Sequence, residues 1–549
     1  MTGPQASATE PGPVRQAGRG IGRAAVLIGA ITVLANLVGF GRQLVFAYTV
    51  GNSCLGTAYA TANQVPNIIY DIVLGGALTS VVVPVLAGPA AHRMSAAGPD
   101  AATAETSQIA SALLTWTVLL LAPISVLVAV TSGPLVSVLL SGAPGCSREA
   151  IVAVSTRMLA VLAPQVVLYG LAVVLYGILQ AHRRFTAPAL APVLSSLVLI
   201  GAYIAFVPLG GGYRGRLGAL PWSAELMLSL GTTAGVAALA LTALGPALRL
   251  RLRLRPALRF PAGVAGRVRG LAAVGIAALI AQDASVVAVI VLANGHDGQG
   301  ALVLYSYGWQ VFFVPYAVLA VPIATSAFPL LSAQSGASFD GTAASSTRAV
   351  MLVSWLGAAL LAGAAIPASR LFAAHSEASQ LALTFAAFAP GLVGYGLAAN
   401  LSRVLFACGR NRVAASAMVG GWLLVIAADV IAVALVSNPW VVPALGLGNT
   451  IGLTVSGIAL LGAVRRARGQ QALRGVGRAA VAGLTGAVVG GGAGAAVSAG
   501  LRVSGFPLNA GVAALACGCV LVGFGLAALI LDGRDLRAMA GRARGWLPR

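Results

Sequence analysis

Charged residues are scarce in this chain: only 9% of its 549 residues are Asp, Glu, Lys or Arg, and lysine is absent. Acidic residues number 13, against 34 arginines. Hydrophobic residues make up 58% of the chain and the mean hydropathy is +0.92. One water-soluble core could not bury so much apolar surface. The composition therefore excludes a soluble globular protein and predicts an all-α polytopic membrane protein.

Histidine and cysteine are also rare, with four and five copies that show no spacing typical of a metal site. The cysteines are typical of small core residues. Cys54 and Cys146 both fall in expected outward-facing connections, where a disulfide is also permitted, and both interpretations stay open. Neither a catalytic constellation nor a Walker-type phosphate loop occurs. The sequence therefore predicts no enzyme, no ATP hydrolysis and no resident cofactor.

Apolar runs long enough to cross a bilayer recur along the chain and predict about 14 transmembrane helices. The expected ranges are 24–51, 58–88, 108–131, 150–181, 188–208, 222–245, 271–294, 302–334, 349–369, 379–408, 413–437, 440–464, 479–501 and 509–531. Among the connections, 26 arginines fall on the side of the N-terminus and five on the other. The positive-inside rule then places both termini in the cytoplasm. The net charge of +21 fits anionic lipid rather than nucleic acid.

Similar segments recur in the two halves of the chain. Pro164-Gln-Val-Val-Leu-Tyr169-Gly170 resembles Pro390-Gly-Leu-Val-Gly-Tyr395-Gly396, and Thr79-Ser80 resembles Thr325-Ser326. They predict two six-helix lobes, related by a pseudo-two-fold axis along the membrane normal, with a cavity between them. The expected organisation is a disordered cytoplasmic tail (1–22), an N-terminal lobe (23–248), a basic cytoplasmic linker (249–270), a C-terminal lobe (271–466), two further helices (467–532) and a basic cytoplasmic tail (533–549).

Ionisable side chains inside the expected spans should face a cavity or a partner, because each costs about 2.5–3.5 kcal/mol at the bilayer centre. They are Arg42, Asp71, Arg157, Asp283, Arg403 and Asp429. Arg157 and Arg403 lie near span ends, which favours a structural role through snorkelling. Arg42 and Asp71 lie on adjacent antiparallel spans. They could form an ion pair that lines the cavity, or a buried pair that only locks two helices together.

Asp283 and Asp429 are lone acids in apolar helices. With the hydroxyls of Thr450 and Thr454, which share a helix face, they would form a hard-oxygen site for Na⁺ or H⁺ coupling. Protonated acids bonded to nearby carbonyls are the alternative. The aromatic residues Tyr305, Tyr307 and Trp309, beside Gln310 at the start of the eighth span, are typical of an interfacial belt, with cavity lining as the alternative.

Residues 38–84 contain Gly39-Phe40-x-Arg42, Val65-Pro66-Asn67 and Gly76-Ala77 through Pro84, and the eighth expected span contains Pro315 through Pro329. Residues 38–84 resemble the opening motif of the MurJ/MviN lipid II flippases, in the MOP exporter superfamily, and Pro315 through Pro329 resembles that family's eighth helix. The resemblance implies two six-helix lobes plus two C-terminal helices. The implied activity is transport of undecaprenyl-linked peptidoglycan precursor across the bacterial cytoplasmic membrane by alternating access.

The same resemblance implies a substrate site with few charges. The family's cavity arginines and glutamate align with Asn36, Tyr70, Asp71, Gly75 and Gln310, so only Arg42 keeps its positive charge. We expect Arg42 to meet a substrate phosphate. The expected substrate-binding set is Arg42, Asn36, Asn63, Asn67, Asp71 and Gln310. The cation site of some relatives aligns with Asp283, Asp429 and Thr450 or Thr454.

The expected partners are a lipid-linked substrate and membrane lipids, with cell-wall synthesis enzymes as further candidates, and we expect a monomer. Two alternatives stay open. One is an exporter of another amphipathic or polyprenyl-linked substrate, and the other is a non-transporting membrane scaffold for cell-wall enzymes.

Overall fold

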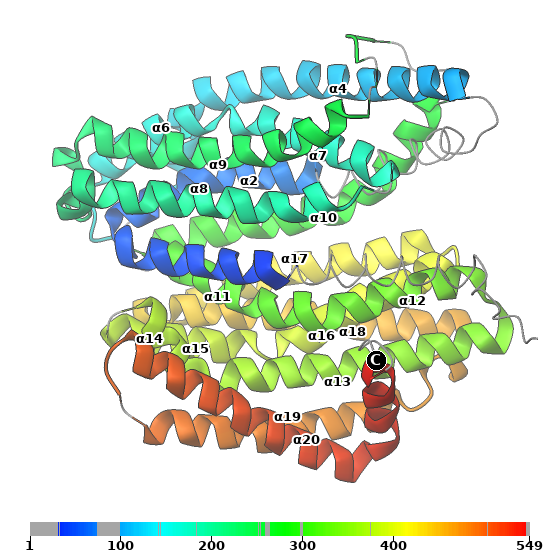
Figure 1. Cartoon of the computed structure of the whole chain (residues 1–549). Coiled ribbons are helices and arrows are strands. Elements are labelled where there is room, and N and C mark those ends of the chain that lie inside the picture. The colour runs from blue at the N-terminus through cyan, green and yellow to red at the C-terminus, as the bar shows by residue number, and fades with distance from the viewer. Residues whose placement is uncertain are drawn as a thin grey trace, which may run out of the picture.

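The computed structural model describes residues 31–73, 99–258, 264–296, 300–373, 375–501 and 503–544, apart from positions 32, 141, 143, 183, 251 and 253. These residues form helices joined by short connections, without a strand among them, which confirms the all-α class. Figure 1 shows long helices lying side by side in two groups, which we call the N-terminal and C-terminal bundles. Their limits do not test the predicted lobe boundaries, which stay predictions.

The N-terminal bundle ends with α9, which packs against α6, α7 and α8, while α2 packs against α6 and α7. Its helices are one over residues 33–49, α2 (Cys54–Val73), α4 (Pro99–Val130), α5 (Ser132–Leu139), α6 (Arg148–Leu162), α7 (Gln165–Ala181), α8 (Thr186–Gly210) and α9 (Trp222–Leu248).

In the C-terminal bundle α18 packs against α15, α16 and α17, and α13 packs against the pair α19 and α20. Its helices are α10 (Val264–His296), α11 (Ala301–Pro315), the π-helical turn η4 (Tyr316–Ala320), α12 (Val321–Ala333), α13 (Gly336–Gly363), α14 (Ala365–Phe372), α15 (His375–Phe388), α16 (Gly391–Ala407), α17 (Asn411–Leu435), α18 (Val441–Arg468), α19 (Val476–Gly500) and α20 (Phe506–Arg544).

Within the described residues, 11 helices are long and apolar enough to cross a membrane, or 12 if the bent pair of α15 and α16 counts as one span. They match the third to fourteenth expected spans in order. The first two expected spans, 24–51 and 58–88, lie partly outside the described residues. The chain is thus a multi-pass membrane protein, while the count of 14 stays a prediction.

Prolines stand at the breaks between consecutive helices within several of the expected spans. Pro164 and Pro390 each stand immediately before a new helix, α7 and α16. At the second of these breaks the span bends by 40°. Pro315 ends α11 and is followed by the π-helical turn, as expected where proline removes a backbone donor. The eighth span therefore contains a π-helical turn directly after Pro315.

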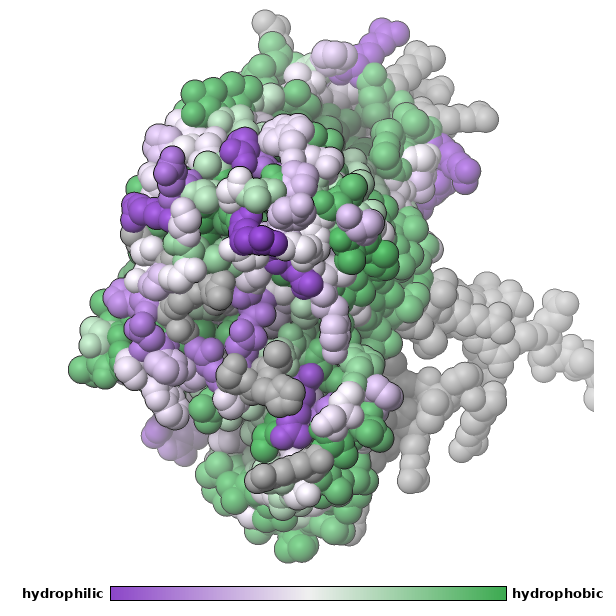
Figure 2. Space-filling view, turned by 90° about the vertical axis from the view of Figure 1, so that its left-hand side faces the viewer, coloured by the Kyte–Doolittle hydropathy of each residue, from purple (hydrophilic) through white to green (hydrophobic). Residues whose placement is uncertain are grey.

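The surface is polar at one end of the helices and apolar along their flanks. Figure 2, which views the helix ends at the left of Figure 1, shows hydrophilic residues over the middle of that face and hydrophobic residues around it. Large apolar side chains such as Leu37, Val126, Leu241 and Ile530 are exposed on the helices. This distribution fits a slab of lipid around the flanks and water at the ends.

The described part of the expected basic linker, 249–270, lies against the N-terminal bundle, while the linker boundaries stay predictions. The backbone N–H groups of Arg255 and Ala257 donate to the hydroxyls of Ser111 and Thr115 on α4, at 3.0 and 3.1 Å. Leu250, in the same stretch, is buried. Helix α10 already begins at Val264, and α20 continues to Arg544, inside the expected basic tail. The expected tail 1–22 lies outside the described residues.

Candidate functional site

A polar cavity of about 580 Å³ lies between the two bundles. The helix over residues 33–49, with α2, α8 and α9, forms one side, and α10 and α11, with single residues of α17 and α18, form the other. The structure brings all six predicted substrate residues to this cavity: Asn36, Arg42, Asn63, Asn67, Asp71 and Gln310. Their role in substrate binding stays a prediction, but their convergence is a structural fact.

Arg42 and Asp71 are the only charged side chains among the described residues that line the cavity. The predicted Arg42–Asp71 ion pair, in either version, is wrong, because no such pair forms between these two described side chains. The helices are antiparallel and joined near residues 50–53, so Arg42 is level with the region around Ala62. Asp71 lies nine residues beyond Ala62, which is about 13 Å of helix rise.

Tyrosines from several helices form much of the cavity wall. The Tyr59 hydroxyl lies 2.9 Å from the Tyr203 hydroxyl and 2.7 Å from that of Thr232, which joins α2, α8 and α9. The Tyr169 hydroxyl donates to the side-chain oxygen Oδ1 of Asn67 at 3.0 Å. This bond fixes the orientation of the Asn67 amide that faces the cavity.

The structure corrects the expected position of the aromatic residues at the start of α11. Tyr305, Tyr307 and Trp309 line the cavity together with Gln310, so the interfacial belt is wrong and the cavity alternative holds. Tyr307 is only 1% exposed. The Asn449 amide of α18 donates to the Tyr305 hydroxyl at 2.9 Å. The α11 aromatics turn inward because α15 and α18 pack against this helix.

Asp283 and Asp429 are buried, at 4% and 0% exposure, and neither lines the cavity. All four of their carboxylate oxygens lack a hydrogen-bond partner among the described residues. Such oxygens fit a bound cation or a bound proton. Asp429 packs directly against Gly448 of α18, where an added Cβ would strike its carboxylate.

The two predicted threonines lie on another side of α18. Thr450 donates to the Ala387 carbonyl at 2.6 Å. Thr450 and Thr454 pack against Gly391 and Gly394 of α16, away from the Gly448 position that touches Asp429. The structure thus does not bring the threonine hydroxyls to Asp429, and the Na⁺ or H⁺ coupling site stays a prediction.

Glu225 is an intramembrane acid that the sequence reasoning missed. Its carboxylate accepts two short bonds from Arg157, from Nε at 3.0 Å and from Nη2 at 2.8 Å. Glu225 lies in the first turn of α9 and Arg157 lies within α6. Both helices begin at the same end of the molecule and therefore run parallel. An acid at the start of the expected span 222–245 was the signal that could have prompted a search for a basic partner on another span. The pair agrees with the structural role predicted for Arg157.

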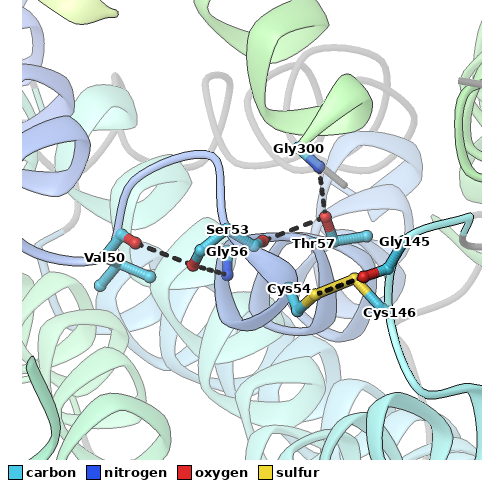
Figure 3. Close-up of a disulfide and its surroundings, with 8 residues drawn as sticks. All are labelled: Val50, Ser53, Cys54, Gly56, Thr57, Gly145, Cys146 and Gly300. Atoms are coloured by element: carbon cyan, nitrogen blue, oxygen red, sulfur yellow. Dashed lines mark hydrogen bonds between the residues drawn. A yellow bond between two sulfur atoms is a disulfide. The ribbon is translucent and has the colours of Figure 1, made fainter. Parts of the chain in front are cut away.

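A disulfide joins Cys54 at the start of α2 to Cys146 in the connection before α6 (Figure 3). This settles the alternative that the sequence left open. Next to the disulfide, the backbone N–H of Gly300 donates to the Thr57 hydroxyl at 2.8 Å, which joins the two bundles. The Asn294 amide of α10 donates to the Thr61 hydroxyl and to the Leu139 carbonyl, both at 3.0 Å. These contacts hold the bundles together at the disulfide end.

Two bundles of membrane-spanning helices around a polar cavity define a multi-pass protein of the transporter class. The family model described as "Lipid II flippase MurJ" matches residues 46–505. The chain therefore belongs to the MurJ family.

Curated relatives carry the same description. The chain is 26% identical over 318 residues to a lipid II flippase MurJ of Burkholderia cenocepacia, covering 56% of this chain and 57% of the relative. It is 24% identical over 311 residues to a probable lipid II flippase MurJ of Rhizobium tropici, covering 56% and 54%. The chain thus matches little more than half the length of these relatives.

Solved structures show the same fold. A structure described as lipid II flippase MurJ in an inward closed conformation has a TM-score of 0.67 at 15% identity, and covers 90% of this chain and 98% of its own. An inward-facing multidrug resistance MATE transporter of the MOP superfamily has a TM-score of 0.61 at 12% identity, and covers 80% and 98%. At these identities the likeness concerns the fold alone.

Proposed function

We propose that this protein is a flippase that moves lipid II, the undecaprenyl-linked peptidoglycan precursor, across the bacterial cytoplasmic membrane by alternating access, with both termini in the cytoplasm. One observation carries the proposal. The six residues predicted to bind the substrate converge on a single cavity between the two bundles. A cavity between two bundles is the position that can face either side of a membrane in turn.

Arg42 is the group best suited to hold the substrate's pyrophosphate. Its planar guanidinium offers several N–H donors to phosphate oxygens, and such charge-assisted bonds are stronger than neutral ones. It is the one cationic side chain among the described cavity residues. Asn36, Asn63 and Gln310 supply neutral groups for the sugar and amide parts of the headgroup.

The test is growth rescue in a bacterium depleted of its own lipid II flippase. We expect the wild-type chain to restore growth and Arg42→Ala to fail, because the phosphate loses its cation. Arg410→Ala is the matched control, since Arg410 is exposed at the end of α16 and lies outside the cavity. Immunoblotting of membranes must show equal amounts of all three proteins. Failure of the wild-type chain itself would refute lipid II transport.

A second candidate is export of another amphipathic or polyprenyl-linked molecule with less negative charge. It is favoured by the presence of Asp71 in the cavity, which balances the charge of Arg42. In this case the wild-type chain would not rescue growth. It would instead lower the cell content of a different amphipathic compound, and Arg42→Ala would reverse this change.

Cation or proton coupling would use the buried acids. If Asp429 holds Na⁺ or H⁺, transport should depend on the gradient of that ion, and Asp429→Asn should remove the dependence because a neutral amide offers no charge to the ion. Transport measured in vesicles with and without a Na⁺ gradient, and at two external pH values, checks this. Thr454→Val serves as the comparison at the predicted threonine position. Unchanged gradient dependence in Asp429→Asn would exclude this coupling.

A further inference from the structure

A second, smaller cavity of about 140 Å³ lies inside the C-terminal bundle. It is formed by α10, η4, α16, α17 and α18, and it exceeds the space of about 10–15 Å³ that one water molecule needs by the same measure. Gln282 and Trp422 line both this cavity and the main one. The two cavities are therefore neighbours that share part of a wall.

The smaller cavity and the main cavity are each lined by a closely packed pair of tyrosines. Tyr316 and Tyr395 line it, with ring centroids 4.2 Å apart and planes at 36°. In the main cavity Tyr70 and Tyr169 are also 4.2 Å apart, with planes at 32°.

The two pairs occupy equivalent positions of the internal repeat. Tyr169 and Tyr395 hold the same place after Pro164 and Pro390. Tyr70 precedes Thr79 by nine residues, as Tyr316 precedes Thr325. The repeat has thus placed one close tyrosine pair in each bundle, the first lining the main cavity and the second lining the smaller cavity.

Arg403 gives the second pocket a positive charge. It lies in α16, and its Nη1 donates to the Ala399 carbonyl one turn earlier, at 2.5 Å. No described carboxylate lies within ion-pair distance of it, and no Asp or Glu is among the described residues that line the pocket. A guanidinium has five N–H donors, so most of them are left for another acceptor. Ionisable side chains inside membrane proteins face a cavity and pair with other charges or with backbone carbonyls. Arg403 has one such carbonyl and lines the smaller cavity with its remaining donors unassigned.

We propose that the pocket at Arg403 is a second anion-binding site that takes a phosphate group of a lipid-linked molecule. The molecule is either the transported substrate, which then touches both pockets in succession, or a membrane phospholipid that stays bound. Binding of the transported substrate in this pocket rests on the proposed function. Binding of a phosphate group by Arg403 does not. Tyr316 belongs to the π-helical turn, so a phosphate bound in this pocket would contact that turn of the eighth span.

The test measures binding of sodium pyrophosphate to the purified full-length chain by thermal shift, in the Arg42→Gln background. The Arg42→Gln change removes the cation of the main cavity. Pyrophosphate binding that remains in this variant therefore belongs to another site. We expect Arg403→Gln, added to it, to weaken pyrophosphate binding about tenfold or more. Arg410→Gln is the matched control and should leave binding unchanged. Loss of binding on Arg42→Gln alone would place the probe in the main cavity and overturn the second site.

Two further variants separate binding from folding. Arg403→Lys keeps the charge and should retain most of the binding. Ala399→Leu keeps Arg403 but fills the pocket, and it should abolish binding while the protein stays monodisperse. Unchanged pyrophosphate binding in Ala399→Leu would also overturn the proposal.

Native mass spectrometry identifies the source of the phosphate. A phospholipid that copurifies with the wild-type chain and is lost in Arg403→Gln identifies a resident lipid. Pyrophosphate binding without such a lipid identifies the transported molecule. Absence of both the lipid and the pyrophosphate effect refutes the site. Growth rescue is not needed for any of these results, so a failure of lipid II transport is distinguishable from a failure of the site.

Discussion

Individual charged residues in this membrane protein are held in very different ways. Arg157 and Glu225 form a two-bond pair, Arg42 faces a polar cavity, and Asp429 has no hydrogen-bond partner among the described residues. The same type of side chain can therefore be structural or functional, depending on its surroundings. The presence or absence of a bonded partner separates these cases better than burial or sequence position does.

The Arg157–Glu225 pair predicts an asymmetric response to mutation. Glu225 is 2% exposed, whereas the Arg157 side chain is 46% exposed. Arg157→Ala leaves a buried carboxylate without its cation and should cost about 2–3 kcal/mol of stability. Glu225→Gln frees an arginine that can reach solvent and should cost less than about 1 kcal/mol. Thermal unfolding in detergent measures both. A Glu225→Gln variant that is the less stable of the two would contradict this account.

At the scale of the helix, glycine sets how closely α17 and α18 approach. A Cβ at Gly452 would lie 2.4 Å from a Val425 methyl and 2.7 Å from the Gly421 carbonyl oxygen. Gly462, on the same helix, has nothing within 4 Å of its Cβ position. Small residues permit this kind of close packing between membrane helices. Gly452 is therefore a contact residue, and Gly462 is not.

Alanine substitution at these two glycines should have opposite effects. Gly452→Ala must push α17 and α18 apart or distort them, which typically costs about 1–3 kcal/mol. Gly462→Ala adds a methyl group in open space and removes backbone freedom from the unfolded chain, so stability should stay equal or rise slightly. Thermal unfolding of the two variants side by side checks this. Equal destabilisation by both would show that backbone proximity is not the limiting factor.

The sequence predicts the positions of the helices along the chain better than it predicts which of their faces pack together. Apolar runs predict the spans, because these depend on local composition. The breaks at Pro164 and Pro390 were not predicted, although the missing backbone donor of proline explains them. Family motifs predict that Arg42 and Gln310 share a cavity. The sequence could not predict that Thr450 lies on a different side of α18 from Gly448, which contacts Asp429 of α17, because the rotation of a buried helix depends on packing with several neighbours. The cavity tyrosines of α7 and α8 were missed for the same reason.

At the scale of the whole molecule, the disulfide end holds the two bundles together. Asn294, 1% exposed, bonds to α2 and α5 of the opposite bundle, and Gly300 bonds to Thr57. The Cys54–Cys146 bond fixes the α2 start that carries Thr57. Disulfides persist in oxidising compartments, which agrees with an outward position of this end. Alternating access requires that these inter-bundle bonds break when the cavity opens outward.

Asn294→Ala should therefore expose the cavity from outside. The variant loses two hydrogen bonds between the bundles, each typically worth about 0.5–1.5 kcal/mol, so the outward-open population should rise about fivefold or more. Ser306 lines the cavity, so a cysteine introduced by Ser306→Cys reports the opening. In this background the free cysteines Cys408, Cys517 and Cys519 are changed to alanine and the disulfide is kept. An impermeant maleimide added to intact cells should label this cysteine faster in Asn294→Ala.

Asn438→Ala is the control for this experiment. Asn438 is exposed just after α17, at the same end of the molecule as Asn294. It makes no side-chain hydrogen bond among the described residues. It should label at the parental rate. If Asn294→Ala labels no faster than this control, the Asn294 bonds do not limit opening, and the bundles must be held together elsewhere. If labelling occurs only from the cytoplasmic side of inverted vesicles, the disulfide end faces the cytoplasm and the predicted orientation of the chain is reversed.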